Sequence, residues 1–87
     1  MIPRRIHALK TWPEFFAAIE SGAKRFEVRR DDRGFSVGDL LELRESDPIT
    51  DEYSGREITV RITYMLRGPA FGIELDHVVM SIEVATP

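Results

Sequence analysis

The sequence has no cysteine, a single tryptophan and no long apolar run. Without cysteine the chain can form neither disulfides nor thiolate metal sites, a composition that fits a reducing cytoplasm. No apolar stretch approaches the roughly 20 residues that a membrane-spanning helix needs. Residues 1–5 contain a basic pair with no apolar segment behind it, which argues against a signal peptide. We therefore expect a cytoplasmic protein with no membrane association.

An excess of positive charge is also missing, since the net charge is −3. The net charge therefore argues against nonspecific coating of duplex nucleic acid as the main activity. The charges are unevenly spread, however. Eight of the twelve Lys and Arg residues lie within residues 1–33, whereas residues 45–57 carry five acidic residues and one basic residue, Arg56. This asymmetry allows a local basic surface on an acidic protein, although a solvated mixed-charge surface explains the charges alone more simply.

The first part of the chain predicts a strand followed by a helix. Residues 5–10 are expected to form the strand. The stretch 11–14, Thr-Trp-Pro-Glu, reads as a capping box in which the Thr11 hydroxyl takes a backbone amide at the helix start. Pro13 suits the first turn, where its missing N–H has no consequence. Ser21 and Gly22 are expected to end the helix, with Gly22 in a left-handed conformation.

The rest of the chain predicts strands. They are expected at residues 24–30, 40–44, 57–66 and 77–84, with a polar loop at 46–55. The inward-facing residues should be Phe26 and Val28 in the strand at 24–30, and Ile58, Val60 and Ile62 in the strand at 57–66. In the strand at 77–84 they should be Val78, Met80, Ile82 and Val84.

The predicted fold follows from this order, β-α-β-β-β-β, over a single domain of residues 1–87. It is a mainly β protein with one helix, of the α+β class. A small, largely antiparallel barrel with the helix plugging one side suits the pattern, because closure removes exposed sheet edges.

One constellation stands out as a candidate site: Gly22-x-Lys24-x-x-Glu27-x-Arg29. Glu27 and Arg29 are two residues apart in a strand and project from one face. Lys24, at the strand entrance, can reach the same region. Arg29 supplies forked donors that fit a phosphate or a base edge, and Glu27 can accept from an amine or a hydroxyl. A surface ion pair worth about 0–1 kcal/mol is the structural alternative, and the residues alone favour neither interpretation.

This pattern resembles the signature of the ASCH superfamily, which has a PUA-like barrel. The whole chain is similar to a small bacterial and phage family of that group, the DUF3850-like proteins. The similar stretches span about residues 7–82 and include Phe26-Glu27-Val28-Arg29 and Asp32-Arg33-x-Phe35-x-Val37-Gly38-Asp39. The resemblance implies binding of RNA or a nucleotide in a cleft between the helix and the barrel.

Some ASCH relatives are enzymes, so a small hydrolase is the alternative. One group hydrolyses the acetyl amide of N4-acetylcytidine with a Lys, a Thr three residues on and a distant Glu. Lys24 fits the first position, but Glu27 stands where that Thr would be, and a carboxylate cannot replace a hydroxyl nucleophile unchanged. Other relatives cleave single-stranded RNA, a reaction in which Lys24 and Glu27 could stabilise charge and act as general base.

Further candidates lie outside the motif. Tyr53 and Phe71, both expected in loops, are candidates for stacking on bases. Arg33 and Lys10 could extend a basic rim. Trp12 and Phe16 are interpreted as helix-to-barrel packing. The stretches Asp32-Arg33 and Val37-Gly38-Asp39 are interpreted as turns.

We expect no cofactor and no metal. His7 and His77 lack metal-like partner spacing, and no phosphate-cradling glycine loop is present. A protein partner that binds near Tyr53 is a third functional possibility.

Overall fold

The computed structural model describes residues 5–85. Along the chain lie β1 (Ile6–Thr11), α1 (Pro13–Glu20), β2 (Phe26–Arg30), β3 (Leu40–Ser46), β4 (Tyr53–Arg67) and β5 (His77–Val84). The predicted class and order of elements are confirmed. The polar loop predicted at 46–55 is shorter, because β3 continues to Ser46 and β4 already begins at Tyr53.

The expectation of no signal peptide rests mainly on residues 1–4, which lie outside the described range. Within residues 5–85, no helix combines the length and the apolar character that crossing a membrane requires.

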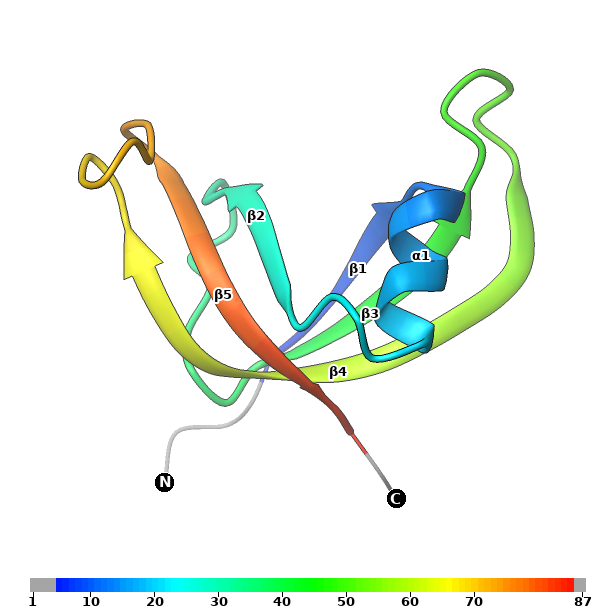
Figure 1. Ribbon diagram of the computed structural model, residues 1–87, viewed down its shortest axis with the longest axis horizontal. Coiled ribbons are helices and arrows are strands. Elements are labelled where there is room, and N and C mark those ends of the chain that lie inside the picture. Colours follow the sequence, from blue (N-terminus) through cyan, green and yellow to red (C-terminus); the bar gives the residue numbers. More distant parts are fainter. Residues whose placement is uncertain (1–4, 86–87) are drawn as a thin grey trace.

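The strands form one curled sheet in the order β1-β3-β4-β5-β2. β1 runs parallel to β3, and every other neighbouring pair is antiparallel. β4 is 15 residues long, and it pairs with β3 along its first part and with β5 along its second. The register shifts between Ile62 and Tyr64, and such bulges increase strand twist. The sheet therefore bends into a half-barrel, with α1 inside its curve beside β1 and β3 (Figure 1).

The two outer strands, β1 and β2, face each other without pairing, so the predicted barrel stays open on this side. Basic side chains cover the backbone carbonyls of both edges instead. Arg29 Nη2 donates to the Lys10 carbonyl at 2.8 Å, and Arg33 Nη1 donates to the Ala8 carbonyl at 2.9 Å. Lys24 Nζ donates to the Phe26 carbonyl at 2.6 Å. Charged side chains at a strand edge also oppose pairing with another chain.

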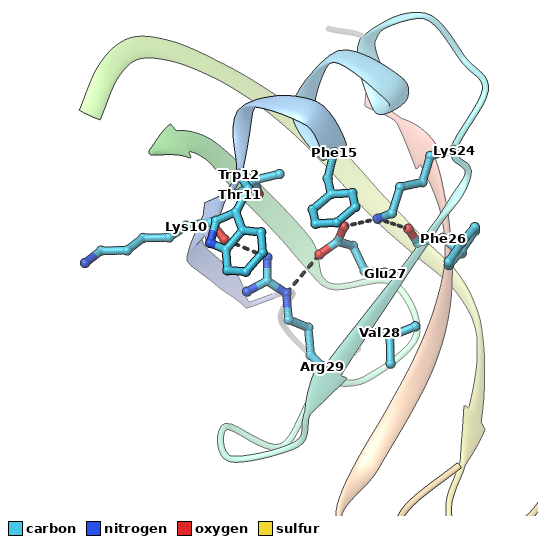
Figure 2. A pocket seen from close by; sticks show the side chains of 9 residues that line it. All are labelled: Lys10, Thr11, Trp12, Phe15, Lys24, Phe26, Glu27, Val28 and Arg29. Atoms are coloured by element: carbon cyan, nitrogen blue, oxygen red, sulfur yellow. Dashed lines mark hydrogen bonds and ion pairs between the residues drawn. The ribbon is translucent and has the colours of Figure 1, made fainter. Parts of the chain in front are cut away.

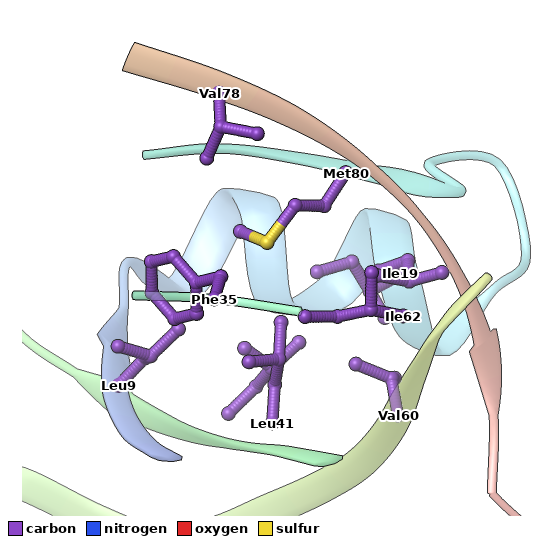
Figure 3. Close-up of a cluster of buried hydrophobic side chains, with 10 residues drawn as sticks. Leu9, Ile19, Phe35, Leu41, Val60, Ile62, Val78 and Met80 are labelled. Atoms are coloured by element: carbon purple, nitrogen blue, oxygen red, sulfur yellow. The ribbon is translucent and has the colours of Figure 1, made fainter. Parts of the chain in front are cut away.

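The core fills the hollow of the half-barrel (Figure 3). It is built from alternate residues of every long strand, together with one helix residue and Phe35 from the β2–β3 connection. The cluster comprises Leu9, Ile19, Phe35, Leu41, Leu43, Val60, Ile62, Val78, Met80 and Ile82. The inward positions predicted for β4 and for most of β5 are confirmed. Val84 is an exception, because it lies at the end of β5 and is 56% exposed.

The helix starts differently from the prediction. Pro13 is the first helical residue, as expected, but the N-cap is Trp12 and no side chain caps the helix start. The predicted capping box is therefore wrong, and the Thr11 hydroxyl is left without that role. The helix ends as predicted, with Gly22 at φ +84°, a left-handed conformation that glycine adopts without strain.

Asp39 has more than the predicted turn role. Its carboxylate is buried and lies 2.9 Å from His7 Nε2, and it also accepts from the amides of Arg5 and Ser36. Burial opposes ionisation, but the His7 hydrogen bond and the two amides outweigh it and hold the pKa of Asp39 below its usual value. The pair ties β1 to the start of β3.

Candidate functional site

The inward face of β2 is the opposite of the predicted one. Glu27 is buried, whereas Phe26 and Val28 are 46% and 51% exposed. Glu27 pairs with Met80 of β5, and directly opposed residues in antiparallel strands point to the same face. Because Met80 belongs to the core, Glu27 also points into the half-barrel. The predicted alternation along β2 is therefore present, but the buried face is the one that carries the Glu27 carboxylate and not the apolar face.

Glu27 is held between two cations (Figure 2). Lys24 Nζ lies 2.5 Å from Oε1, and Arg29 Nε lies 2.8 Å from Oε2. The Glu27 side chain is only 4% exposed, against 17% for Lys24 and 27% for Arg29. The ammonium of Lys24 also sits 4.9 Å from the centre of the Phe26 ring. The structure thus brings Lys24, Glu27 and Arg29 into one hydrogen-bonded cluster.

The cluster lies in a cavity of about 630 Å³ between β1, α1 and β2, which we call the edge cavity. Its lining residues are Lys10, Thr11, Trp12, Phe15, Lys24, Phe26, Glu27, Val28 and Arg29. Trp12 and Phe15 stack at a centroid distance of 5.8 Å, and both are partly exposed. The edge cavity therefore joins aromatic walls to a charged cluster, within the range of about 300–1,000 Å³ typical of ligand pockets.

The charges around the edge cavity are largely paired. The cluster itself has two cations and one carboxylate, so it can accept a single anionic or neutral polar group. Elsewhere in residues 5–85, Arg25 and Arg30 are the basic residues with no carboxylate partner. This surface therefore suits a compact ligand better than a long polyanion.

Lys10 and Arg33 do not form the expected basic rim. The side chain of Lys10 points away from the edge cavity (Figure 2) and pairs with Asp51 at 2.6 Å. That hydrogen bond raises the pKa of Lys10. Only the Lys10 backbone, through its contact with Arg29, takes part in the cluster. Arg33 binds the Ala8 carbonyl and lies outside the residues that line the cavity.

The two predicted stacking residues also lie outside the edge cavity. Tyr53 begins β4 rather than lying in a loop, is 54% exposed, and has the Lys10 ammonium 5.9 Å from its ring centre. Phe71 is in the β4–β5 loop and is 90% exposed. Both rings are accessible, but neither borders the charged cluster.

Sequence reasoning overlooked the aromatic and hydroxyl lining. Trp12 was interpreted as packing, yet it is 49% exposed at the cavity, whereas Phe16 is buried as expected. Thr11 was assigned to the helix cap and instead lines the edge cavity. The sequence did contain a signal for this lining. The predicted helix begins directly after the predicted strand, so Thr11 and Trp12 lie at the junction between the two elements. Among residues 5–85, no group of three or more potential ligands that could hold a metal ion occurs.

The fold and the edge cavity define a small mainly β domain with one helix, open along one side, with a charged and aromatic hollow at the opening. The chain belongs to the family described as "Domain of unknown function (DUF3850)", whose profile matches residues 6–82. It is also similar to an "Uncharacterized 12.9 kDa protein in GpA 3'region" of Escherichia phage P2. The two are 36% identical over 59 residues, which make up 68% of this chain and 52% of the phage protein. The chain thus spans about half the length of that relative.

Proposed function

We propose that the protein binds RNA or a nucleotide by taking a base into the edge cavity. The observation that carries the proposal is the pairing of aromatic walls with a preorganised cluster of Lys24, Glu27 and Arg29 in one hollow. Bases offer flat faces for stacking and polar edges for hydrogen bonding, and both needs are met here. The ASCH and PUA resemblance of the sequence points to the same ligand class. The cytoplasm, the expected location, contains such ligands.

Arg29 is the best-placed contact for the ligand. Its Nε and Nη2 atoms are held by Glu27 and by the Lys10 carbonyl, which fixes the plane of the guanidinium. Its remaining N–H donors can meet a phosphate oxygen or a base edge without reorganisation of the side chain. Glu27 acts through Arg29 and Lys24 by holding both cations in place.

This geometry favours binding over hydrolysis. Each oxygen of Glu27 already accepts a hydrogen bond from a cation, so the carboxylate serves as an anchor rather than as a free general base. We therefore expect acylated nucleosides and short RNAs to be retained without turnover. Product formation that disappears in Glu27→Gln would favour the hydrolase alternative instead.

The binding proposal is tested with Arg29→Lys, which keeps a cation beside Glu27 but removes the planar fork. Arg30→Lys is the matched control, because Arg30 is adjacent and outside the edge cavity. Hydrogen bonds to charged groups contribute about 1.5–3 kcal/mol, so Arg29→Lys should weaken binding of short single-stranded RNA by about tenfold or more. Fluorescence anisotropy measures both variants. Equal affinity in wild type and Arg29→Lys would refute the role of Arg29, and absence of binding by the wild type to RNA and to nucleotides would refute the function.

A second test separates the cavity wall from the other exposed rings. Trp12→Ala should weaken RNA binding by about 1–3 kcal/mol, the usual value of one stacked base. Phe71→Ala removes a more exposed ring outside the edge cavity and should leave the affinity unchanged. The opposite result would move the binding surface to the β4–β5 loop. The affinity for RNA should depend only weakly on salt, because only Lys24 and Arg29 can meet phosphates in the cavity. A plot of the logarithm of the binding constant against the logarithm of the salt concentration should have a slope no steeper than about −1.4.

A further inference from the structure

Thr11 is a buried polar residue without a partner. The residue is only 3% exposed, and its hydroxyl makes no hydrogen bond within residues 5–85. Arg44 Nε also lacks a hydrogen bond, but it lies 3.4 Å from the Glu57 carboxylate. Thr11 has no comparable contact. It ends β1, lines the edge cavity and precedes a helix start that no side chain caps.

An unsatisfied buried hydroxyl is unfavourable. Leaving such a group unpaired destabilises the folded protein, whereas a valine of nearly the same shape would avoid that cost. The hydroxyl of Thr11 therefore destabilises the free protein relative to Val at this position. The cost is offset when a group that enters the edge cavity supplies the missing hydrogen bond.

We propose that Thr11 is a specificity-determining residue whose hydroxyl pairs with a polar atom on the edge of the bound base. This inference rests on the proposed function. Both oxygens of Glu27 and two nitrogens of Arg29 are engaged within the protein, so the Thr11 hydroxyl is the buried polar group of the cavity that makes no hydrogen bond. A hydroxyl can donate and accept, which matches an amine, a ring nitrogen or a carbonyl on a base.

The arrangement also explains what the cavity should reject. Flat rings without polar edge atoms could stack on the aromatic wall of the cavity, but they would leave Thr11 unpaired. Sites built to hydrogen-bond a ligand discriminate strongly against analogues that lack the partner group. Nucleoside 5′-monophosphates should therefore bind more tightly than ribose 5-phosphate, and more tightly than an aromatic ring without polar substituents.

The test compares wild type with Thr11→Val, Thr11→Ser and the control Thr63→Val. Thr63 lies on β4 outside the edge cavity, and its hydroxyl donates to the Ser81 carbonyl at 3.2 Å. The four nucleoside 5′-monophosphates serve as probes in calorimetric titrations, and melting temperatures are measured without ligand. Thr11→Val should melt at or above the wild-type temperature yet bind about tenfold more weakly. Thr11→Ser should retain binding, and Thr63→Val should bind normally without any gain in melting temperature.

Two results would overturn the role of Thr11 alone. If wild type binds a monophosphate and Thr11→Val binds it equally well, the hydroxyl makes no contact with the ligand. If Thr11→Val melts well below wild type, the hydroxyl has a structural partner in the free protein. If wild type binds none of the monophosphates and no short RNA, the proposed function fails, and this inference fails with it.

Discussion

Removing the cations around Glu27 should destabilise the protein more than removing Glu27 itself, although both changes break the same two ion pairs. The reason is unequal burial. Glu27 is 4% exposed, while Lys24 and Arg29 are 17% and 27% exposed. In Glu27→Leu, the two cations can turn towards water. In the double variant Lys24→Met with Arg29→Met, the carboxylate stays buried without a partner.

The expected magnitudes follow from this difference. An uncompensated buried charge costs about 3–5 kcal/mol, and the double variant should lose at least that much. Glu27→Leu should lose about 1.5–3 kcal/mol, the value of a hydrogen bond to a charged group. A domain of 87 residues has a total stability of roughly 4–13 kcal/mol, so the double variant lies close to unfolding. Replacing both Lys24 and Arg29 by alanine would be destabilising for the same reason, so a loss of ligand binding in that variant could result from unfolding.

The triple variant Lys24→Met, Glu27→Leu, Arg29→Met completes the comparison. It should be more stable than the double variant by about 2–4 kcal/mol, because the buried charge is gone while the lost Arg29 contact with Lys10 is common to both. Urea unfolding at neutral pH, followed by circular dichroism, measures all four proteins. If the double variant is no less stable than Glu27→Leu, or the triple variant gains nothing, Glu27 is not a buried anchor.

Two further predictions concern the frame around the site. Hydrogen bonds outweigh burial and hold the pKa of Asp39 and of Asp31 below their usual 3.8, the first through His7 and the second through Arg67 and the amides of Phe35 and Gly34. The stability that these two carboxylates contribute is complete above pH 3.8 and is lost as the pH falls through their lowered pKa values. The free energy of unfolding should therefore fall less steeply with decreasing pH in Asp39→Asn than in wild type, and equal slopes would contradict this role of Asp39. Gly68→Ala should destabilise the protein by about 1–3 kcal/mol in urea unfolding, because the added Cβ would clash with the backbone carbonyl oxygen of Glu74. Wild-type stability of this variant would contradict the β4–β5 loop geometry.

Much of the candidate site could be predicted, because it depends on spacing along one segment. Lys24, Glu27 and Arg29 are close in sequence, and a strand places alternate residues on one face whatever its surroundings. The walls of the cavity could not be predicted in this way. Trp12 and Thr11 reach the cluster because β1 and β2 become the facing edges of the curled sheet, a relation between distant segments. Lys10 lines the cavity at the end of β1, but its ammonium pairs with Asp51 and points away from the cluster.

The local features of this protein could be predicted from its amino-acid sequence: the order of elements, the helix that starts at Pro13, and the glycine that ends it. These follow from backbone preferences and from short periodic patterns. Three features depend instead on contacts between distant segments: the buried face of β2, the unpaired Thr11 hydroxyl, and the covering of the open edges. Alternation distinguishes the two faces of a strand, but only pairing with β5 and the curvature of β4 determine which of them meets the core.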